Sequence, residues 1–315
     1  MTIRTLLGAA ALCIFAAGGT LAQVKIQEFK VPSFPHDVAC TADGVAWYSG
    51  QQSGTLGRLD PKTGSVKEIP LGKGSAPHGV IVGPDGALWL TDGGQNAMVR
   101  VDPKTEEVKV FPLPKGTPYA NLNTAAFDAK GVVWFTGQSG YYGKADPKTG
   151  EVKVWQSPKG RGPYGIAATP SGDIYYASLA GSHIAKIDTA TGAASVIEPP
   201  NADQGARRVW SDSKGMVWVS EWNSGHVSRY DPGAKTWKTW KLPGGQPKPY
   251  AVYVDEKDMV WLSDWDADAM LRFDPRNEKF ETFKRSGASV RQILGCPGAV
   301  WTPESGTNML VVYRY

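Results

Sequence analysis

One aromatic residue recurs along this chain at nearly even spacing, each time inside the same short pattern. The pattern is roughly D-x-x-G-x-V-W-x-[ST]-[DEG], and successive copies lie 40 to 45 residues apart. The central aromatic residues are Trp47, Trp89, Trp134, Tyr175, Trp218, Trp261 and Trp301. A unit of that length is too short to bury a core of its own, so the copies must pack against one another.

Each copy holds four short β-type runs separated by turn residues. In the second copy these runs are HGVIVG, ALWLTD, MVRVD and VKVFPL. A DPKTG-like segment, as at Asp60 and Asp146, joins the last two runs and has the Pro and Gly of a hairpin turn. Four strands in about 40 residues are typical of a β-propeller blade. The chain is therefore predicted to be all-β, a seven-bladed β-propeller of four-stranded blades.

The ring is predicted to close through the start of the mature chain. The seventh copy ends after three runs, VRQILGC, AVWTPE and NMLVVYRY, and so lacks a fourth strand. The segment Val24–Pro32, VKIQEFKVP, matches the fourth-strand pattern of the other copies and is expected to complete blade 7. Closure of this kind removes the exposed strand edges that invite aggregation.

Two cysteines fall at the predicted seam. Cys40 ends the first strand of blade 1, and Cys296 lies at the equivalent place in blade 7. A closed ring makes these blades neighbours, so we predict a disulfide between the two residues, with two buried free thiols as the alternative.

The first 22 residues have the layout of a secretory signal peptide. Arg4 is followed by an apolar stretch from Leu6 to Ala17 and then by small residues that end at Ala22. We therefore expect a leader over residues 1–22, one propeller domain over residues 23–315, and a periplasmic or secreted mature protein with no membrane segment.

The charge of the chain bears on its partner. The net charge is +4, and the Lys and Arg residues are scattered instead of gathered in a run. This argues against nucleic acid or a polybasic membrane contact as the main partner. We expect a monomer that binds a small molecule or a peptide at the mouth of the central channel.

The candidate site lies where the copies differ. The innermost strands of a propeller line its channel and begin on one face, so the residues at their starts form a ring. Scaffold positions stay Trp, Gly, Val or Asp, whereas these positions vary in charge and size, as a ligand site requires. This first ring comprises His36, His78, Asn123, Tyr164, Arg207, Tyr250 and Arg291.

The chemistry of these side chains suggests their roles. His36 and His78 are the candidate catalytic bases, because a neutral imidazole accepts a proton near pH 7. Arg207 and Arg291 are candidate substrate ligands, since a guanidinium group binds carboxylates and oxyanions. The uncharged members are also assigned to substrate binding: Asn123, Tyr164 and Tyr250.

A second ring falls three residues after each central aromatic, at Gly50, Asp92, Gly137, Ser178, Glu221, Asp264 and Glu304. Its four carboxylates, Asp92, Glu221, Asp264 and Glu304, are candidates for a divalent metal site or for acid–base chemistry. The remaining histidines, His183 and His226, precede third strands and are expected at the surface. The alternative for both rings is that polar residues simply line a channel filled with water.

Two segments resemble the virginiamycin B lyase family, and the resemblance extends over essentially all of the mature chain. They are PHGVIVGPDGALWLTD, Pro77–Asp92, and the third-strand segment LGRLD, Leu56–Asp60. Gluconolactonase-like and NHL-repeat propellers are similar more weakly. The resemblance implies an enzyme that linearises streptogramin B antibiotics by elimination. It also implies a histidine base and a magnesium ion held by glutamates, which stabilises the developing enolate and carboxylate.

Position by position, the chain departs from the family at the site. The family has histidines at the starts of its sixth and seventh innermost strands, where this chain has Tyr250 and Arg291. Of the two metal-binding glutamates, one falls on Ser289 and the other on or beside Glu304. At most one of the four family residues is therefore matched in place.

A rotated version of the site is a further hypothesis. His36 and His78, in blades 1 and 2, have the same mutual relation as the family's histidine pair, and Asp92 and Ala76 then take the glutamate places. Two functions stay open. One is an enzyme, either a lyase or a lactonase-like hydrolase, that acts on an ester or lactone with catalytic residues at the mouth of the channel. The other is a propeller that binds an anionic ligand, a peptide or a partner protein without catalysis.

Overall fold

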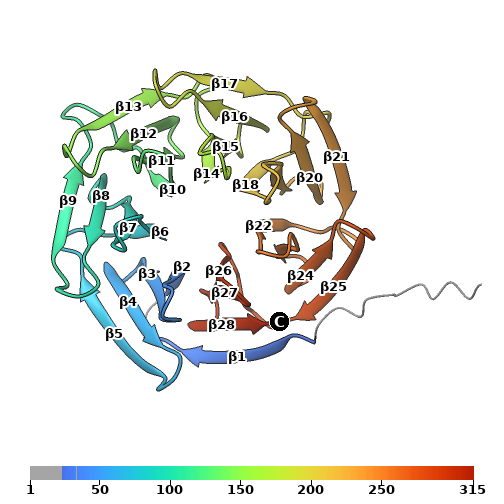
Figure 1. Cartoon of the computed structure of the whole chain (residues 1–315), viewed down its shortest axis with the longest axis horizontal. Helices are drawn as coiled ribbons and strands as arrows, with labels where there is room; N and C mark the ends of the chain where they lie inside the picture. The colour runs from blue at the N-terminus through green and yellow to red at the C-terminus, as the bar shows by residue number, and fades with distance from the viewer. Residues whose placement is uncertain (1–22, 33) are drawn as a thin grey trace, which may run out of the picture.

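The chain forms a ring of seven four-stranded antiparallel sheets around a central channel (Figure 1). The computed structural model describes residues 23–32 and 34–315, so the expected leader over residues 1–22 lies outside the described residues. Within the described ranges, no helix is long and apolar enough to span a membrane. The structure confirms the all-β, seven-bladed propeller.

Blades 1 to 6 each use four consecutive strands, which follow one another from the channel outward. Blade 1 comprises β2 (Pro35–Cys40), β3 (Ala46–Gly50), β4 (Thr55–Asp60) and β5 (Ser65–Pro70). Blade 2 comprises β6 (Pro77–Val82), β7 (Leu88–Asp92), β8 (Ala97–Val101) and β9 (Val108–Pro112). Blade 3 comprises β10 (Leu122–Phe127), β11 (Val133–Gly137), β12 (Tyr141–Ala145) and β13 (Val152–Gln156).

The next three blades repeat this order. Blade 4 comprises β14 (Pro163–Ala168), β15 (Ile174–Ser178), β16 (His183–Ile187) and β17 (Ala194–Ile197). Blade 5 comprises β18 (Ala206–Ser211), β19 (Val217–Glu221), β20 (His226–Asp231) and β21 (Thr236–Lys241). Blade 6 comprises β22 (Pro249–Val254), β23 (Val260–Asp264), β24 (Ala269–Asp274) and β25 (Lys279–Lys284).

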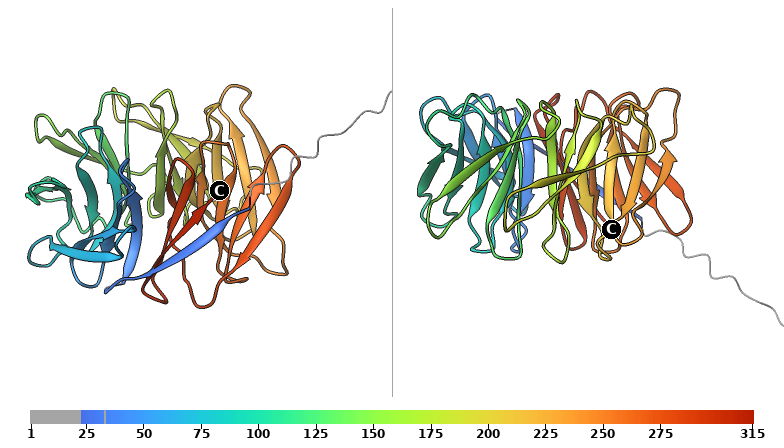
Figure 2. Two further views of the ribbon diagram at one scale, coloured as in Figure 1. Left: turned by 60° about the horizontal axis from the view of Figure 1, so that its bottom comes forward. Right: turned by 90° about the horizontal axis from the view of Figure 1, so that it is seen from above.

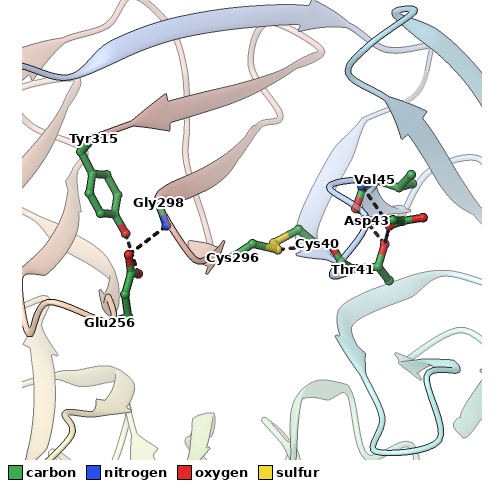
Figure 3. The surroundings of a disulfide bond; sticks show 8 residues. All are labelled: Cys40, Thr41, Asp43, Val45, Glu256, Cys296, Gly298 and Tyr315. Atoms are coloured by element: carbon green, nitrogen blue, oxygen red, sulfur yellow. Dashed lines mark hydrogen bonds between the residues drawn. A yellow bond between two sulfur atoms is a disulfide. The ribbon is translucent and has the colours of Figure 1, made fainter.

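Blade 7 joins the two ends of the chain. It comprises β26 (Leu294–Cys296), β27 (Ala299–Glu304), β28 (Met309–Arg314) and, outermost, β1 (Lys25–Lys30). Strand β1 pairs antiparallel with β28 over its full length, as the blue strand beside the red blade in Figures 1 and 2 shows. The N-terminal strand therefore completes blade 7, as the sequence predicts. Cys40 and Cys296 form a disulfide across the same seam (Figure 3).

The repeated Trp and Asp residues are scaffold. All seven central aromatic residues are at most 2% exposed and pack between blades. In blade 3 the carboxylate of Asp128 accepts a hydrogen bond from the Trp134 indole at 2.9 Å and another from the Lys130 N–H at 2.9 Å. Asp212 and Asp255 hold the indoles of blades 5 and 6 in the same way. These aspartates therefore fix turns and tryptophans and are not available for chemistry.

A buried hydroxyl two residues after the central aromatic links each of five blades to the next. In blade 2, Thr91 Oγ1 accepts from the Gly79 N–H at 2.8 Å and donates to the Asn123 carbonyl of blade 3 at 2.6 Å. Blades 4 and 7 have Ala177 and Pro303 at this position. The other hydroxyls that bridge blades in this way belong to Ser49, Thr136, Ser220 and Ser263.

Candidate functional site

Six of the seven innermost strands are irregular at their start, on the face that we call the mouth. In β2 the register with β3 shifts between Pro35 and Val38, and the equivalent shift recurs in β6, β10, β14, β18 and β22. Such a bulge re-aims side chains and leaves residues out of the ladder. It allows two consecutive side chains per strand, such as His36 and Asp37, to join the network at the mouth.

Two histidines lie at the centre of this network. The imidazole rings of His36 and His78 have centroids 3.8 Å apart, and both residues are buried. Nδ1 of His36 lies 2.8 Å from Oδ1 of Asp37, and Nε2 of His78 lies 3.1 Å from Nδ2 of Asn123. The structure therefore brings together the two candidate bases and one candidate substrate ligand from blades 1, 2 and 3.

The hydrogen bonds set the tautomers of the two rings. Asn123 accepts from the Thr124 hydroxyl through Oδ1 at 2.6 Å, so its Nδ2 must be the group that donates to His78 Nε2. His78 then carries its proton on Nδ1, a buried atom with no hydrogen-bond partner among the described residues. His36 donates from Nδ1 to Asp37, which leaves the lone pair on Nε2.

Both histidines are neutral at pH 7. Burial is the main reason that the pKa of His36 lies well below its ordinary value, and the nearby guanidinium groups, first that of Arg208, add to the effect. Burial also lowers the pKa of His78 well below its ordinary value, helped by the neighbouring His36. Burial raises the pKa of Asp37, while Arg208 opposes that shift. A neutral imidazole is the form that accepts a proton.

Arg208 connects the two sides of the mouth. Its Nη2 lies 3.3 Å from Oδ1 of Asp37, its Nη1 donates to the Thr124 hydroxyl, and only 4% of the residue is exposed. A guanidinium group beside a buried carboxylate compensates the charge that burial would otherwise penalise. Arg208 thus belongs to the structural support of the His36–Asp37 pair.

The other arginines lie among aromatic rings. The guanidinium carbon of Arg207 is 3.4 Å from the ring centroid of Tyr250 and 4.2 Å from that of Trp222. That of Arg291 is 4.8 Å from the centroid of Trp265. Stacking on π faces orients a guanidinium group while leaving its edge for hydrogen bonds. Both arginines are partly exposed, as anion ligands must be.

A hydrogen-bonded tyrosine pair completes the mouth. The hydroxyls of Tyr164 and Tyr250 are hydrogen-bonded to each other, and Arg207 Nη2 lies 3.4 Å from the Tyr164 hydroxyl. Burial acts to raise the pKa of Tyr164, but Arg207 and Arg208 outweigh it, so the net pKa is lowered. Burial raises the pKa of Tyr250. The two tyrosines assigned to substrate binding therefore lie beside Arg207, which is assigned to the same task.

The four carboxylates of the second ring are not brought together. Each ends the second strand of its blade and is bound by the loop that leads into the innermost strand of that blade. Asp92 accepts from the Ala76 N–H at 2.9 Å, Glu221 from the Gln204 amide at 2.8 Å, Asp264 from the Lys248 N–H at 2.8 Å and Glu304 from Arg285 Nε at 2.6 Å. Each of these carboxylates thus anchors a loop of its own blade.

The donor set at the mouth does not fit magnesium. Within the described residues, the one group of three or more His, Cys, Asp or Glu with ligand atoms close enough for a cation is His36, Asp37 and His78, within 4.8 Å of one another. Magnesium requires oxygen ligands, whereas two of these three are imidazoles. The single carboxylate is moreover paired with Arg208. We therefore derive no step through the metal that the family resemblance implies.

Sequence reasoning missed the residues that directly follow the first ring. Asp37, Thr124 and Arg208 bond to ring members or to each other, and Gln292 accepts from the Val38 N–H at 3.0 Å. These positions also vary between copies, which is the signal that could have identified them. The expected surface position of His183 is wrong, because this residue is fully buried in β16, with Nδ1 3.0 Å from the Gly181 carbonyl.

Comparisons with known proteins agree with the fold. The pattern of the Virginiamycin B lyase family matches residues 9–273, and no curated protein matches the chain. A solved streptogramin B lyase is similar at 19% identity over 92% of this chain and 97% of that chain, with a TM-score of 0.84. A catalytically inactive virginiamycin B lyase from Staphylococcus aureus with quinupristin is similar at 18% identity over 93% and 100%, with a TM-score of 0.85.

A third similar structure is the extracellular domain of a hybrid two-component system from B. thetaiotaomicron. It is 15% identical over 91% of this chain and 42% of that chain, with a TM-score of 0.73. At such identities the structural likeness shows the shared propeller fold. The family pattern covers most of the chain, and on that match the chain belongs to the virginiamycin B lyase family.

Proposed function

We propose that the chain is a carbon–oxygen lyase that opens an ester or lactone bond of a small molecule bound at the mouth. The observation that carries this proposal is the His36–Asp37 pair, with Nδ1 2.8 Å from Oδ1 and the imidazole held neutral by burial. A carboxylate bonded to Nδ1 orients the ring and stabilises the imidazolium that forms when Nε2 takes a proton.

The proposed reaction is an elimination. Nε2 of His36 removes the proton from a carbon next to a carbonyl group. The electron pair of that C–H bond forms a C=C bond with the neighbouring carbon, while the C–O bond on that carbon breaks. The ester oxygen leaves with the bonding electrons as part of a carboxylate. No water is consumed, so a lactone gives one product with the mass of the substrate, whereas an open-chain ester gives an alkene and a separate carboxylate.

The negative charge that develops in this reaction needs compensation. The charge falls on the enolate oxygen and on the departing carboxylate. In the family, a magnesium ion compensates this charge. In this chain, Arg207 and Arg291 are partly exposed guanidinium groups at the same mouth, oriented by aromatic faces. Guanidinium groups bind carboxylates through paired, charge-assisted hydrogen bonds. We assign these two arginines to that charge.

Incubation of the protein with quinupristin, the compound in one of the similar structures, tests the proposal. Mass spectrometry should show conversion to an isomer of unchanged mass. His36→Ala should lower the turnover rate by roughly 10²- to 10⁴-fold, the usual contribution of a general base. His226→Ala, at a half-buried position on the third strand of blade 5, is the matched control and should leave the rate unchanged.

Other outcomes distinguish the alternatives. A product that has gained one water assigns the chain to lactonase-like hydrolysis and overturns the elimination. An unchanged rate in His36→Ala removes His36 as the base.

Binding without catalysis is a second candidate, favoured by a separate observation. Much of the mouth is paired internally, through the Arg208–Asp37 ion pair and the Tyr164–Tyr250 hydrogen bond. Such a network suits a rigid receptor for an anionic small molecule or peptide. Saturable binding of quinupristin with no product, lost in the Arg207→Gln variant, would support this candidate over the lyase.

A periplasmic or secreted location is part of the proposal. A disulfide such as Cys40–Cys296 persists in oxidising compartments, and residues 1–22 have the layout of a leader. Expression of the full chain should give a mature N-terminus at Gln23 in the exported fraction. An intact Met1 in the cytosolic fraction would contradict it.

A further inference from the structure

A second hollow opens on the face opposite the mouth. The innermost strands all begin at the mouth, so their C-terminal ends gather on the far face, as do Cys40 and Cys296, which end β2 and β26 (Figure 3). A cavity of about 350 Å³ lies there, which we call the far-face cup. Its lining residues include Ala39, Ile81, Phe127, Ala168, Trp210 and Tyr253.

The lining of the cup is apolar and uncharged. None of the described residues that line it is Asp, Glu, Lys, Arg or His, and four alanines from β10 and β14 leave the space that larger side chains would fill. Ile81, Phe127, Ala168 and Trp210 remain partly exposed inside it. An apolar concavity of this size, left uncovered on a soluble protein, is typical of a ligand site.

One wall of the cup carries polar groups. Trp210 and Tyr253 both line the cup, with ring centroids 5.0 Å apart, and their side chains have an indole N–H and a phenol hydroxyl. Burial raises the pKa of the Tyr253 hydroxyl, so it is protonated at neutral pH. A neutral occupant with one hydrogen-bond acceptor satisfies this wall, whereas a charged occupant would be desolvated without a partner.

The size of the cup limits what it can hold. A cavity of about 150 Å³ holds one benzene ring, so this volume suits a molecule of about two fused rings or a short acyl chain. Towards the mouth, the channel narrows to a cavity of about 20 Å³ lined by Thr124, Arg208 and Gln292, among others. An occupant therefore enters from the far face and does not pass through to the mouth.

We propose that the far-face cup is a second binding site, for a small neutral aromatic or acyl molecule with a single carbonyl or ether acceptor. The site shares no residue with the His36–Asp37 pair or with Arg207 and Arg291. It is independent of the lyase proposal, and either can fail without the other.

Calorimetric titration with 2-acetylnaphthalene, a neutral two-ring ketone, tests the proposal. We expect one molecule bound per chain, with a negative heat-capacity change from the burial of apolar surface. Ala168→Leu fills the cup and should weaken binding at least tenfold. Ala129→Leu, at an exposed position just beyond β10, is the matched control and should bind as the parent does.

The polar wall is tested separately. Trp210→Phe keeps a ring but removes the N–H, so affinity for 2-acetylnaphthalene should fall by about three- to tenfold, the usual effect of one hydrogen bond. Affinity for 2-ethylnaphthalene, which lacks the carbonyl, should fall less. Arg207→Gln at the mouth should leave both affinities unchanged. No binding to the parent protein, or equal binding by Ala168→Leu when its melting curve shows it folded, would overturn the proposal.

Discussion

At the scale of the residue, two histidines that burial keeps neutral lie at the centre of the mouth and make the stability of the fold depend on pH. The pKa values of His36 and His78 lie below those of the unfolded chain. Below about pH 6.5 these two histidines therefore bind protons in the unfolded state but not in the folded state. Stability should be fully present above this pH and should fall as the pH drops towards the folded pKa values, by about 1.4 kcal/mol per pH unit for each histidine.

Urea unfolding at pH 7.5 and at pH 5.5 measures the loss of stability on acidification. We expect this loss to be smaller in His78→Asn than in the parent protein. The difference between the two proteins isolates the histidine from the carboxylates that also titrate. Equal losses of stability in both would contradict the assignment of His78 as buried and neutral.

Arg208 allows a second prediction at this scale. Arg208→Met leaves the Asp37 carboxylate buried without its cation, and breaking a buried pair in this way costs about 3–5 kcal/mol. The double variant Arg208→Met, Asp37→Asn removes both charges and should recover most of that loss in the free energy of unfolding. Denaturant unfolding of both variants measures this difference. If the double variant is no more stable than Arg208→Met, then Arg208 does not stabilise the fold by compensating the charge of Asp37.

At the scale of the element, a hydroxyl of the second strand is hydrogen-bonded within five of the six bulges at the starts of the innermost strands. The bulge in β14 forms with Ala177 at that position. Thr91→Val keeps the shape of the side chain but leaves the Gly79 N–H and the Asn123 carbonyl of the bulge without their partner. Buried groups left unsatisfied in this way cost about 1–3 kcal/mol. We expect a fall of that size in the free energy of unfolding, with β7 and β8 otherwise intact.

Ala177 provides the converse experiment. Blade 4 has an alanine where five other blades have the bridging hydroxyl. Ala177→Ser should therefore gain the bond and be as stable as the parent protein or more so, while Thr91→Val loses stability. Destabilisation by both substitutions would show that the hydroxyl does not hold the blades together.

The bulges also explain what the sequence could not predict about the site. A strand read from its pattern alternates side chains, so His36, Tyr164 and Arg207 were identifiable by counting back from the central aromatic. Asp37 and Arg208 reach the same network because a bulge, fixed by a hydroxyl of the neighbouring strand, breaks that alternation. A pattern within one strand does not contain this information.

The surroundings of the acidic second ring could not be predicted for a related reason. Its positions and their variation were predictable, but the partners were not. Glu304 is bound by Arg285, which directly follows β25 at the position that Leu71 and Leu242 occupy after the fourth strands of blades 1 and 5. Loops that differ in length between copies decide whether such a carboxylate faces a ligand or its own backbone.

At the scale of the whole molecule, the fold was predictable because the repeat fixes the position of every blade. Trp47 and its six counterparts mark the second strands, and the missing fourth strand of blade 7 is enough to assign β1 to that blade. The seam is where the two ends of the chain meet in one blade. Pro303 replaces the bridging hydroxyl there, and the disulfide joins the first strands of blades 1 and 7 instead.

Reduction of the disulfide should therefore destabilise the whole ring. The loop that Cys40 and Cys296 close is 256 residues long in sequence, and a bridge of this kind contributes about 2–4 kcal/mol. The Cys40→Ser, Cys296→Ser protein should melt at a lower temperature than the parent, and dithiothreitol should lower the melting temperature of the parent alone. Identical melting temperatures would show that β1 closes the ring unaided.

The central claim is that the chain's own arginines and a neutral His36 do the work that a metal ion and two other histidines do in the family. The most direct test is the rate at which the purified protein opens quinupristin after removal of divalent cations with EDTA. We predict opening to an isomer of unchanged mass at a rate that added Mg²⁺ does not alter. No opening at all, or opening that EDTA abolishes and Mg²⁺ restores, would contradict it.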